Sequence, residues 1–469
     1  MFTRRRIRLV SALVALALVA AACSQRDDDD DEAAPAAGDE EQEADTGDAE
    51  EEPSIPTEDC VADPTEPVEG DTIRVVSSFP QSGPAASLTQ LAQGWEAYFE
   101  MVNQDEGGVE IGGESFQIEF ESRDDGFEAA RTSANIRELV GEDGEGAFAV
   151  FSVLGTPNVA AIRPFLDELC VPNVFAGTGS PAWGNPEFPW TIGSTLGPYP
   201  LEARAFVDIL LEQKPDATVA MLVQDDDFGR AYEEGFRLAI EGTDIEIVEV
   251  QTYAANQTDV AAQVTSLAAT NADAFFNGAF GLASPSALAT MQEANWDPIT
   301  WISTTAISTA IMGISAESAN GAYTFTNLKD PRDPRYDDDP AMQLMREKVE
   351  QFRPEGFQPN STFTAFGWTQ AAVFVEALKQ AEEPTRLAVM ESLRHLDNLS
   401  DVGLLLDGIS ISTGPDDAFM GESAQLIQYE FDPELGPDSF FVEVGEPLDF
   451  EGQGANPDIT PPDLITDEG

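Results

Sequence analysis

Histidine is almost missing from this sequence, because His395 is the only one among 469 residues. A catalytic triad or a zinc site built on histidine would need ordered partners that are not evident around this residue. The sequence also lacks a Gly-x-Ser-x-Gly elbow, and Asp227-Phe228-Gly229 stands without the phosphate loop and catalytic loop of a kinase. The acidic segment 330–339 lacks the spacing and the glycine of a calcium loop. We therefore expect a protein that is not an enzyme and holds neither a cofactor nor a metal.

Basic residues are scarce as well. Lysine and arginine together number 23 against 87 aspartates and glutamates, which gives a formal net charge of −64. A surface this acidic repels nucleic acid and anionic lipid headgroups. It also destabilises the fold by self-repulsion unless salt screens the charges. We therefore exclude nucleic acid as a partner and infer adaptation to a salty environment.

Long apolar runs are missing after residue 22. The one that is present, Leu9–Ala22, follows an arginine-rich start and is shorter than the ~20 residues that span a bilayer, so residues 1–22 are predicted to be a secretory signal peptide. Residues Val19–Cys23 resemble a bacterial lipobox, in which the cysteine is diacylated and becomes the mature N-terminus, although Ala20 stands where leucine is usual. We therefore expect lipidation of Cys23 and anchoring to the outer face of the cytoplasmic membrane.

The segment at residues 23–69 consists largely of acids with alanine, glycine and proline. It buries too little apolar surface to offset the chain entropy that folding would remove. We expect a disordered, self-repelling tether that lifts the folded part off the membrane. An acidic tail that binds a basic partner is the alternative.

Cysteine is rare too, because only Cys60 and Cys170 remain once Cys23 is acylated. Cys60 precedes the first predicted strand, and Cys170 ends a predicted helix that enters the fourth strand. In an oxidising compartment a disulfide between them is favoured, and two buried free thiols are the alternative.

From residue 72 onward, short apolar runs rich in β-branched residues alternate with longer stretches of helical period. Such strands separated by single helices are typical of parallel sheets covered on both faces, so the predicted fold class is α/β with two doubly wound lobes. Helices are predicted at Ala341–Gln351 and Thr362–Gln380. The predicted strands are Ile73–Phe79, Phe116–Glu121, Ala147–Val153, Pro172–Ala176, Thr218–Val223, Ile245–Val250, Ala274–Gly278 and Ile299–Ser303, followed by short ones at 408–412 and 426–431.

The alternation of strands and helices is interrupted at residues 177–200, a segment rich in glycine, proline and tryptophan. We interpret this segment as a crossing between the two lobes and expect a second crossing after residues 321–325. The predicted first lobe is 70–195 plus 327–400, and the predicted second lobe is 196–326 plus 401–450. The tail at 451–469, rich in proline, aspartate and glycine, is predicted to be disordered.

An ordered series of segments resembles the type I periplasmic solute-binding proteins of ABC importers, in the leucine/isoleucine/valine and amide/urea group. The series includes Ile73–Pro84 as the first strand and ligand loop, Val171–Thr178 as the fourth strand, Gln224–Tyr232 as a strand-to-helix turn, and Phe366–Leu378 as a long return helix. The resemblance covers residues 72–450. It implies two lobes joined by three crossovers, with a small-molecule solute trapped between them by hinge closure.

In an open parallel sheet, ligands bind beyond the carboxyl ends of the strands, where helix N-termini present free N–H groups. In the resemblance, Thr156 matches a hydroxyl that binds a ligand carboxylate or amide oxygen. Capping of helices is the alternative for the small polar residues, and core packing is the alternative for the phenylalanines. The predicted ligand-binding residues are Ser82, Thr156, Thr178, Ser180, Phe228, Phe280 and Thr305.

Acidic residues are missing from 301–313, where the amino-acid binders of the resembled group place a glutamate for the ligand's ammonium. A desolvated ammonium without a carboxylate is unfavourable by on the order of several kcal/mol. We therefore expect a neutral or carboxylate-bearing solute, such as an amide or a short organic acid. A zwitterionic branched-chain amino acid is the alternative, with Asp125 or Asp227 supplying the acid.

The expected function is capture of a small solute outside the cell by an exported, lipid-anchored and monomeric protein, which delivers it to ABC permease subunits. A sensor that reports solute occupancy to a membrane receptor or kinase is an alternative with the same fold. An α/β hydrolase is a more remote alternative, because no nucleophile and base stand in order along the chain. Neighbouring permease and ATPase genes would favour delivery.

The acidic surface leads to a testable dependence on salt. Because salt screens repulsion between exposed charges, we expect a higher melting temperature in about 2 M than in about 0.1 M sodium chloride. Thermal unfolding followed by circular dichroism measures this difference. Equal melting temperatures at the two salt concentrations would contradict the inferred adaptation.

Overall fold

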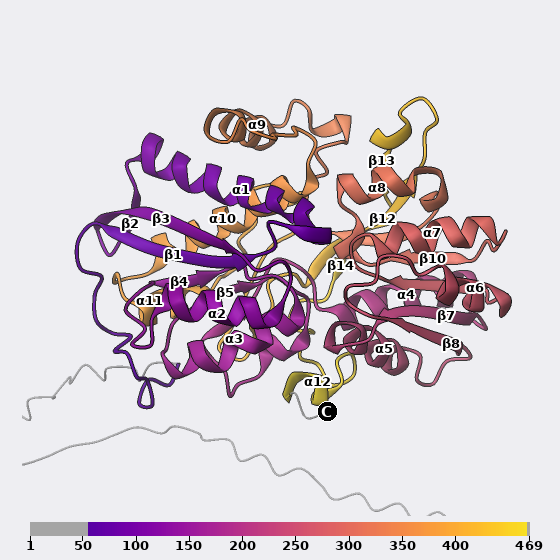
Figure 1. Cartoon of the computed structure of the whole chain (residues 1–469), viewed down its shortest axis with the longest axis horizontal. Helices are drawn as coiled ribbons and strands as arrows, with labels where there is room; N and C mark the ends of the chain where they lie inside the picture. The colour runs from indigo at the N-terminus through magenta and orange to yellow at the C-terminus, as the bar shows by residue number, and fades with distance from the viewer. Residues whose placement is uncertain (1–54, 467–469) are drawn as a thin grey trace, which may run out of the picture. The chain divides into compact units, whose positions relative to one another are not determined.

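The computed structural model describes residues 55–466, so the predicted signal peptide, Cys23 and the tether up to residue 54 lie outside the described residues. Two mainly parallel sheets with helices on their faces form two lobes (Figure 1), which confirms the predicted α/β fold class. Within residues 55–466, none of the helices has both the length and the apolar character of a membrane span.

The first lobe is built on a six-stranded sheet in the order β2-β3-β1-β4-β5-β6. Strand β2 pairs antiparallel with β3, and the other neighbours are parallel. The strands are β1 (Thr72–Phe79), β2 (Val109–Ile111), β3 (Glu114–Asp124), β4 (Ala149–Phe151), β5 (Asn173–Ala176) and β6 (Thr191–Gly193). The helices are α1 (Thr89–Met101), α2 (Ala129–Val140), α3 (Thr156–Glu168), α9 (Pro340–Phe352), α10 (Thr362–Gln380) and α11 (Arg386–Leu393), with short helical turns η1 (Gly83–Leu88), η2 (Val102–Glu106), η3 (Pro181–Gly184) and η6 (Pro334–Tyr336).

The second lobe is built on a sheet in the order β13-β12-β11-β10-β9-β7-β8, with β14 beside β12. Its central strands are parallel, and β12, β13 and β14 pair antiparallel. The strands are β7 (Thr218–Gln224), β8 (Glu246–Tyr253), β9 (Ala274–Gly278), β10 (Ile299–Ile302), β11 (Tyr323–Thr326), β12 (Ser423–Glu430), β13 (Phe440–Glu443) and β14 (Leu448–Asp449). The helices are α4 (Tyr199–Gln213), α5 (Asp227–Ala239), α6 (Ala261–Ala269), α7 (Ala283–Glu293), α8 (Thr309–Ser315) and α12 (Pro462–Thr466), with short turns η4 (Thr304–Ala306), η5 (Ala316–Ala319) and η7 (Gly436–Asp438).

The predicted strands between residues 73 and 303 and the two predicted helices are confirmed, and the strand predicted at 426–431 is β12. The strand predicted at 408–412 is wrong, because this segment makes only an isolated bridge between Leu399 and Ile411. Strands β2, β6, β13 and β14 were not predicted. They span four residues or fewer, which is too short for alternating hydrophobicity to be visible.

Helices α1 and α10 of the first lobe approach each other closely, because each has a glycine at the contact. A Cβ atom at Gly94 would collide with the backbone of α10, and one at Gly367 would collide with the backbone of Leu91. The close approach also lets the Trp95 indole N–H donate to Gln370 Oε1 at 2.9 Å. The pair therefore holds the N-terminal ends of both helices at fixed positions beside the gap between the lobes.

The chain passes between the lobes at residues 194–198, 327–331 and 420–422, as the predicted arrangement with three crossovers requires. Asn327 Nδ2 of the second crossover donates to Thr195 O of the first at 2.6 Å. A Cβ atom at Gly421 of the third would lie 2.6 Å from Thr195 O and 2.7 Å from Gly197 N. The first and third crossovers therefore pack against each other through their backbones, and the Asn327 side chain joins the second to the first.

The N-terminal part of the described chain belongs to the first lobe and not to the predicted tether. A disulfide joins Cys60 to Cys170, with 5.4 Å between the Cα atoms, as the sequence predicted. Ile55 is buried in the core of the first lobe, and Val61 N donates to Glu168 O at 3.0 Å. The tether prediction is therefore wrong for residues 55–69, because Ile55, Val68, the disulfide and backbone hydrogen bonds hold this segment against the first lobe.

Two predictions for the C-terminal part are also wrong. Residues 402–420 were assigned to the second lobe, but the apolar side chains of Val402, Ile411 and Met420 belong to the core of the first. The tail was predicted to be disordered, yet residues 451–466 are ordered, since Thr460 is fully buried and Leu464 lies in the core of the second lobe. Helix α12 also contacts η3 of the first lobe. Burial of a few side chains such as Thr460 and Leu464 therefore orders this segment, although most of its residues are polar, proline or glycine.

Three carboxyl groups meet where the C-terminal segment begins. Oxygen atoms of Asp417, Glu422 and Glu451 all lie within 4.8 Å of one another. Glu422 is 1% exposed and accepts hydrogen bonds from Gly452 N, at 2.8 Å, and from Gly454 N. Burial first, and the neighbouring Asp417 second, raise the pKa of Glu422 to about 8, while burial raises the pKa of Glu451 to about 7.

These raised pKa values predict how stability depends on pH. The pKa of Glu422 in the folded protein, about 8, exceeds its ordinary value of 4.5, so the folded state keeps protons that the unfolded chain releases. The stabilisation from this group is complete below the ordinary pKa and is lost as the pH rises through about 8. We therefore expect the free energy of unfolding of Glu422→Gln to fall less between about pH 5 and about pH 8 than that of the unsubstituted protein.

Urea unfolding at both pH values measures this effect. The control is Glu446→Gln, at an exposed position of the same C-terminal region, which should follow the unsubstituted protein. Parallel pH profiles for Glu422→Gln and the control would show that Glu422 does not bind the extra proton.

Candidate functional site

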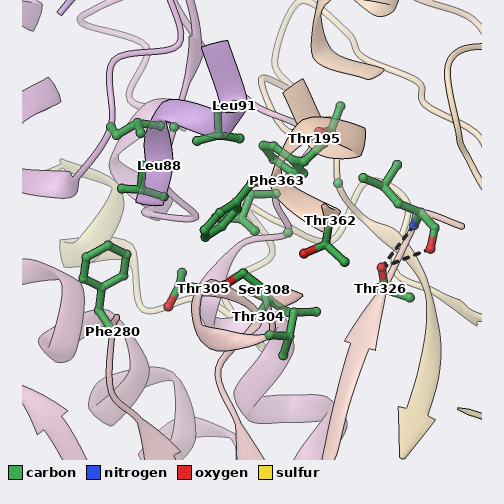
Figure 2. Close-up of a pocket in the computed structure, with 18 of the residues that line it drawn as sticks. Leu88, Leu91, Thr195, Phe280, Thr304, Thr305, Ser308, Thr326, Thr362 and Phe363 are labelled. Atoms are coloured by element: carbon green, nitrogen blue, oxygen red, sulfur yellow. Dashed lines mark hydrogen bonds between the residues drawn. The ribbon is translucent and has the colours of Figure 1, made fainter. Parts of the chain in front are cut away.

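A cavity of about 290 Å³ lies between the lobes, and its wall contains residues of both lobes and of all three crossovers. Figure 2 shows Leu88, Leu91 and Phe363 of the first lobe on one side and Thr304 and Phe280 of the second lobe on the other. Most of the side chains that line the cavity are aliphatic or aromatic. The cavity therefore suits a small molecule whose body is largely apolar.

The cavity lies at the carboxyl ends of the parallel strands. Gly155 and Thr156 follow β4, Asp226 follows β7, Phe280 follows β9, and Thr304 follows β10. The strand order reverses between β1 and β4 in the first sheet and between β7 and β9 in the second. Open α/β sheets leave a crevice for ligands at such a reversal. The rule applied to the sequence therefore selected the edge of each sheet at which this cavity lies.

Four predicted residues line the cavity, namely Thr156, Phe228, Phe280 and Thr305. Thr178 lies directly behind the wall, with its Oγ1 atom 2.6 Å from Thr156 Oγ1 and 3.0 Å from the Tyr199 hydroxyl. Both threonines are buried, and Tyr199 begins α4 of the second lobe. The hydrogen bonds among the three hydroxyls therefore fix the orientation of the Thr156 side chain.

Ser82 and Ser180 were predicted for the site but do not line the cavity. The exposed Ser82 donates from Oγ to Asp124 Oδ2 at 2.6 Å. Ser180 Oγ accepts a hydrogen bond from Ala182 N at 3.3 Å and so caps η3. The structure therefore corrects both assignments, because local hydrogen bonds occupy these hydroxyls.

A buried carboxylate, Glu202 of α4, holds the segment after β10 in place. Its Oε2 accepts hydrogen bonds from Trp301 Nε1 and Thr304 N, both at 3.1 Å. Its Oε1 accepts from Thr304 Oγ1 at 2.5 Å and from the Tyr232 hydroxyl at 2.7 Å. Burial raises the pKa of Glu202 to about 7, and these hydrogen bonds limit the rise.

The same network reaches the cavity through Ser303. Ser303 Oγ lies 2.7 Å from the Tyr232 hydroxyl and 2.7 Å from Thr305 Oγ1. Thr305 is thus linked to Glu202 by two intervening hydroxyl groups. The sequence analysis selected Thr305 but missed Glu202, because the sequence around an acid in a helix does not show which distant loop it supports.

One aromatic contact joins the two lobes across the cleft. The rings of Phe127, after β3, and Phe280, after β9, stack with centroids 5.1 Å apart and planes inclined by 13°. Phe127 has a left-handed backbone (φ 64°), and its N–H donates to Asp125 Oδ1 at 2.8 Å. The buried Asp125 therefore stabilises this turn. It does not line the cavity, so it is not placed to bind a ligand ammonium there.

The acid that lines the cavity at the end of β7 is Asp226, and the neighbouring Asp227 is exposed. Asp226 caps α5 by accepting hydrogen bonds from Phe228 N at 3.1 Å and Gly229 N at 3.3 Å. It also accepts one from Gln224 Nε2 at 2.6 Å. Burial raises the pKa of Asp226, because its charged form is removed from water.

The two basic residues in the wall are already paired. Lys329 Nζ lies 2.8 Å from Asp339 Oδ2, and Arg332 Nη2 lies 2.6 Å from Asp330 Oδ2. Neither cation is free to neutralise a ligand carboxylate without giving up part of its present contact. The electrostatics of the cavity therefore do not favour an anionic group.

Sequence reasoning missed several wall residues. Gln224 and Asp226 stand at the carboxyl end of β7, so the rule that selected Phe228 could have found them. Asn158 lies inside α3, and Thr195 and Leu196 lie in a crossover whose path is not visible in the sequence. Their roles depend on contacts between distant parts of the chain.

Glu202 leads to a prediction about stability. Replacing Glu202 by glutamine places an N–H₂ group where four donors now point, so at least one buried donor loses its acceptor. We expect a loss of about 1–3 kcal/mol in the free energy of unfolding, measured by urea denaturation. Glu212→Gln, at an exposed position of the same helix, is the control and should change stability by less than about 0.5 kcal/mol. Equal effects at the two positions would contradict the supporting role of Glu202.

Comparisons with known proteins agree with this geometry, although curated proteins give no match. Solved structures at 18–21% sequence identity share the fold. One is a substrate-binding periplasmic protein from Ralstonia solanacearum, at 21% identity and a TM-score of 0.68, with 79% of this chain and 100% of that chain covered. Another is a branched-chain amino acid ABC transporter protein with bound valine from Thermus thermophilus, at 18% identity and a TM-score of 0.69, with 81% and 97% covered. A third is a fatty acid ABC transporter substrate-binding protein from Thermomonospora curvata, at 20% identity and a TM-score of 0.68, with 84% and 96% covered.

The sequence profile of the periplasmic binding proteins matches residues 72–430, which is most of the chain. This match covers both lobes and all three crossovers, and it confirms the resemblance found in the sequence. The chain therefore belongs to the periplasmic binding protein family.

Proposed function

We propose that this protein is the extracytoplasmic receptor of an ABC importer, held at the membrane by lipid on Cys23, which captures a small solute and presents it to permease subunits. The observation that carries the proposal is the cavity of about 290 Å³ whose wall is shared by two lobes and by the crossovers that join them. A solute in such a cavity contacts both lobes at once. Its binding therefore favours the arrangement in which the lobes are close together.

The composition of the wall supports a solute with an apolar body and one polar end. Leu88, Leu91 and Phe363 provide apolar surface from the first lobe, while polar groups such as Thr156 and Thr305 lie at the strand ends. Two similar structures carry names that refer to branched-chain amino acids and to fatty acids. Both kinds of molecule have a hydrocarbon part, which suits the largely apolar wall of this cavity.

Binding without chemical conversion is supported by the residues in the wall. No histidine or cysteine lines the cavity in the part of the chain that the structure describes. His395 is exposed, and its Nδ1 atom lies 2.7 Å from Glu391 O in the last turn of α11.

Closure on the solute is the expected response. The protein should be purified without denaturation and its bound solute identified by mass spectrometry. We expect the radius of gyration from small-angle X-ray scattering to be smaller with that solute than after its removal, because the solute favours the closed arrangement of the lobes. An unchanged scattering profile at saturation would contradict a hinged receptor.

Delivery and sensing can be separated in cells. If the protein delivers solute, cells that lack it should lose uptake of the radiolabelled solute. If it is a sensor, uptake should persist while the response to the solute disappears, and the transport part of the proposal would be wrong.

A further inference from the structure

Three residues in the cavity wall carry a buried polar atom without a hydrogen-bond partner among the described residues. These atoms are Asn158 Nδ2, Thr195 Oγ1 and Gln224 Oε1. The residues are 3%, 0% and 5% exposed, respectively. A buried polar group without a partner is unfavourable, because it has lost its hydrogen bonds to water and gained none. Three such groups in one cavity indicate a ligand that supplies the missing partners.

The chemical identity of the Gln224 atom follows from its neighbour. Gln224 Nε2 donates to Asp226 Oδ2 at 2.6 Å, whereas the reverse orientation would set the amide oxygen against a carboxylate. The atom left without a partner is therefore the oxygen, which can only accept a hydrogen bond. As the Asn158 amide is oriented in this structure, its unpartnered atom is Nδ2, which can only donate a hydrogen bond.

The two amides come from opposite lobes. Asn158 lies in the first turn of α3, and Gln224 is the last residue of β7, directly before α5. Helices α3 and α5 contact each other across the cleft. A head group placed between these side chains would therefore bridge the lobes, with Thr195 of the first crossover adding a hydroxyl that can donate or accept.

Charged head groups satisfy this pair poorly. A carboxylate has no hydrogen to offer Gln224 Oε1, and it would lie near Asp226 in a cavity where Lys329 and Arg332 are already paired. An ammonium has no lone pair for Asn158 Nδ2. A zwitterionic amino acid offers both functions, but two charges must then leave water to enter a largely apolar cavity. A carboxamide offers both functions, because its oxygen accepts from Asn158 and its N–H donates to Gln224.

We propose that Asn158 and Gln224 select the solute by its head group, which is uncharged and both donates and accepts hydrogen bonds, as a carboxamide does. This inference rests on the proposed function, because it assumes that the cavity between the lobes is where the solute binds. Neither residue belongs to the set predicted from the sequence.

Three probes with similar branched hydrocarbon bodies test the inference, namely isocaproamide, isocaproate and leucine. Calorimetric titration of the full-length protein should show isocaproamide binding at least about tenfold more tightly than the other two probes. Each lost hydrogen bond weakens binding by roughly that factor. Asn158→Leu and Gln224→Met keep the approximate size of each side chain and remove its amide. Each should weaken isocaproamide about tenfold. Gln224→Met should change isocaproate by less than about threefold, because a carboxylate has no hydrogen to donate to Gln224 Oε1.

Leu91→Met is the matched control, because Leu91 lines the cavity through an apolar side chain. It should change the affinity of all three probes by a similar factor and leave their order unchanged. The melting temperature of each variant shows whether it folds, and two variants at separate positions keep the test decisive if one does not.

The outcomes separate this inference from the proposed function. Tighter binding of leucine or isocaproate by the unsubstituted protein would overturn the inference and leave the receptor function intact. Unchanged selectivity in both amide variants would do the same. Failure of every probe, together with no closure on the co-purified solute, would overturn both.

Discussion

The two lobes meet where three segments cross between them. The first and third of these touch through their backbones, with no room for additional side-chain atoms. A Cβ atom at Gly197 would lie 2.8 Å from Gly421 O, and one at Gly421 would lie 2.7 Å from Gly197 N. Real Cβ atoms do not approach other atoms so closely, so larger residues here would push the crossovers apart. Both glycines also line the cavity. The crossovers and the cavity wall therefore share these residues, and a solute bound there would contact the segments that join the lobes.

The shortage of basic residues limits how such a chain can bind a polar group. The protein has 23 lysines and arginines for 87 acids, and those in the wall are already in ion pairs, Lys329 with Asp339 and Arg332 with Asp330. Releasing a buried cation to bind a ligand anion would leave its acid unpaired, which is strongly unfavourable. Recognition by neutral amides and hydroxyls avoids that exchange. The acidic composition and the uncharged polar groups of the cavity are thus consistent with each other.

The fold could be predicted largely from the sequence, because near-continuous apolar strands separated by amphipathic helices allow few other architectures. The rule that ligands bind at strand ends also placed Thr156, Phe228, Phe280 and Thr305 correctly in the wall. Ser82 and Ser180 also follow strand ends but lie outside the wall. The rule does not distinguish hydroxyls that face a cavity from those that bond to neighbouring residues, here Asp124 and Ala182. Asn158 and Gln224 could not be singled out, because a missing hydrogen-bond partner is a property of the assembled lobes. The order of residues 451–466 was hidden for a similar reason, since Leu464 packs against a distant core.

The balance of contacts across the cleft explains why closure would depend on the solute. Stacking of Phe127 on Phe280 favours the closed arrangement by about 0.5–1.5 kcal/mol. Closing an empty cleft would leave Asn158 Nδ2 and Gln224 Oε1 without water and without partners, at about 1–3 kcal/mol each. This loss opposes closure of the empty cleft, because water can reach both amides when the lobes are apart. A solute that satisfies both amides removes this opposition and adds its own apolar contacts, whereas one that satisfies a single amide removes only half of it. Selection among solutes and closure of the lobes would therefore arise from the same two side chains.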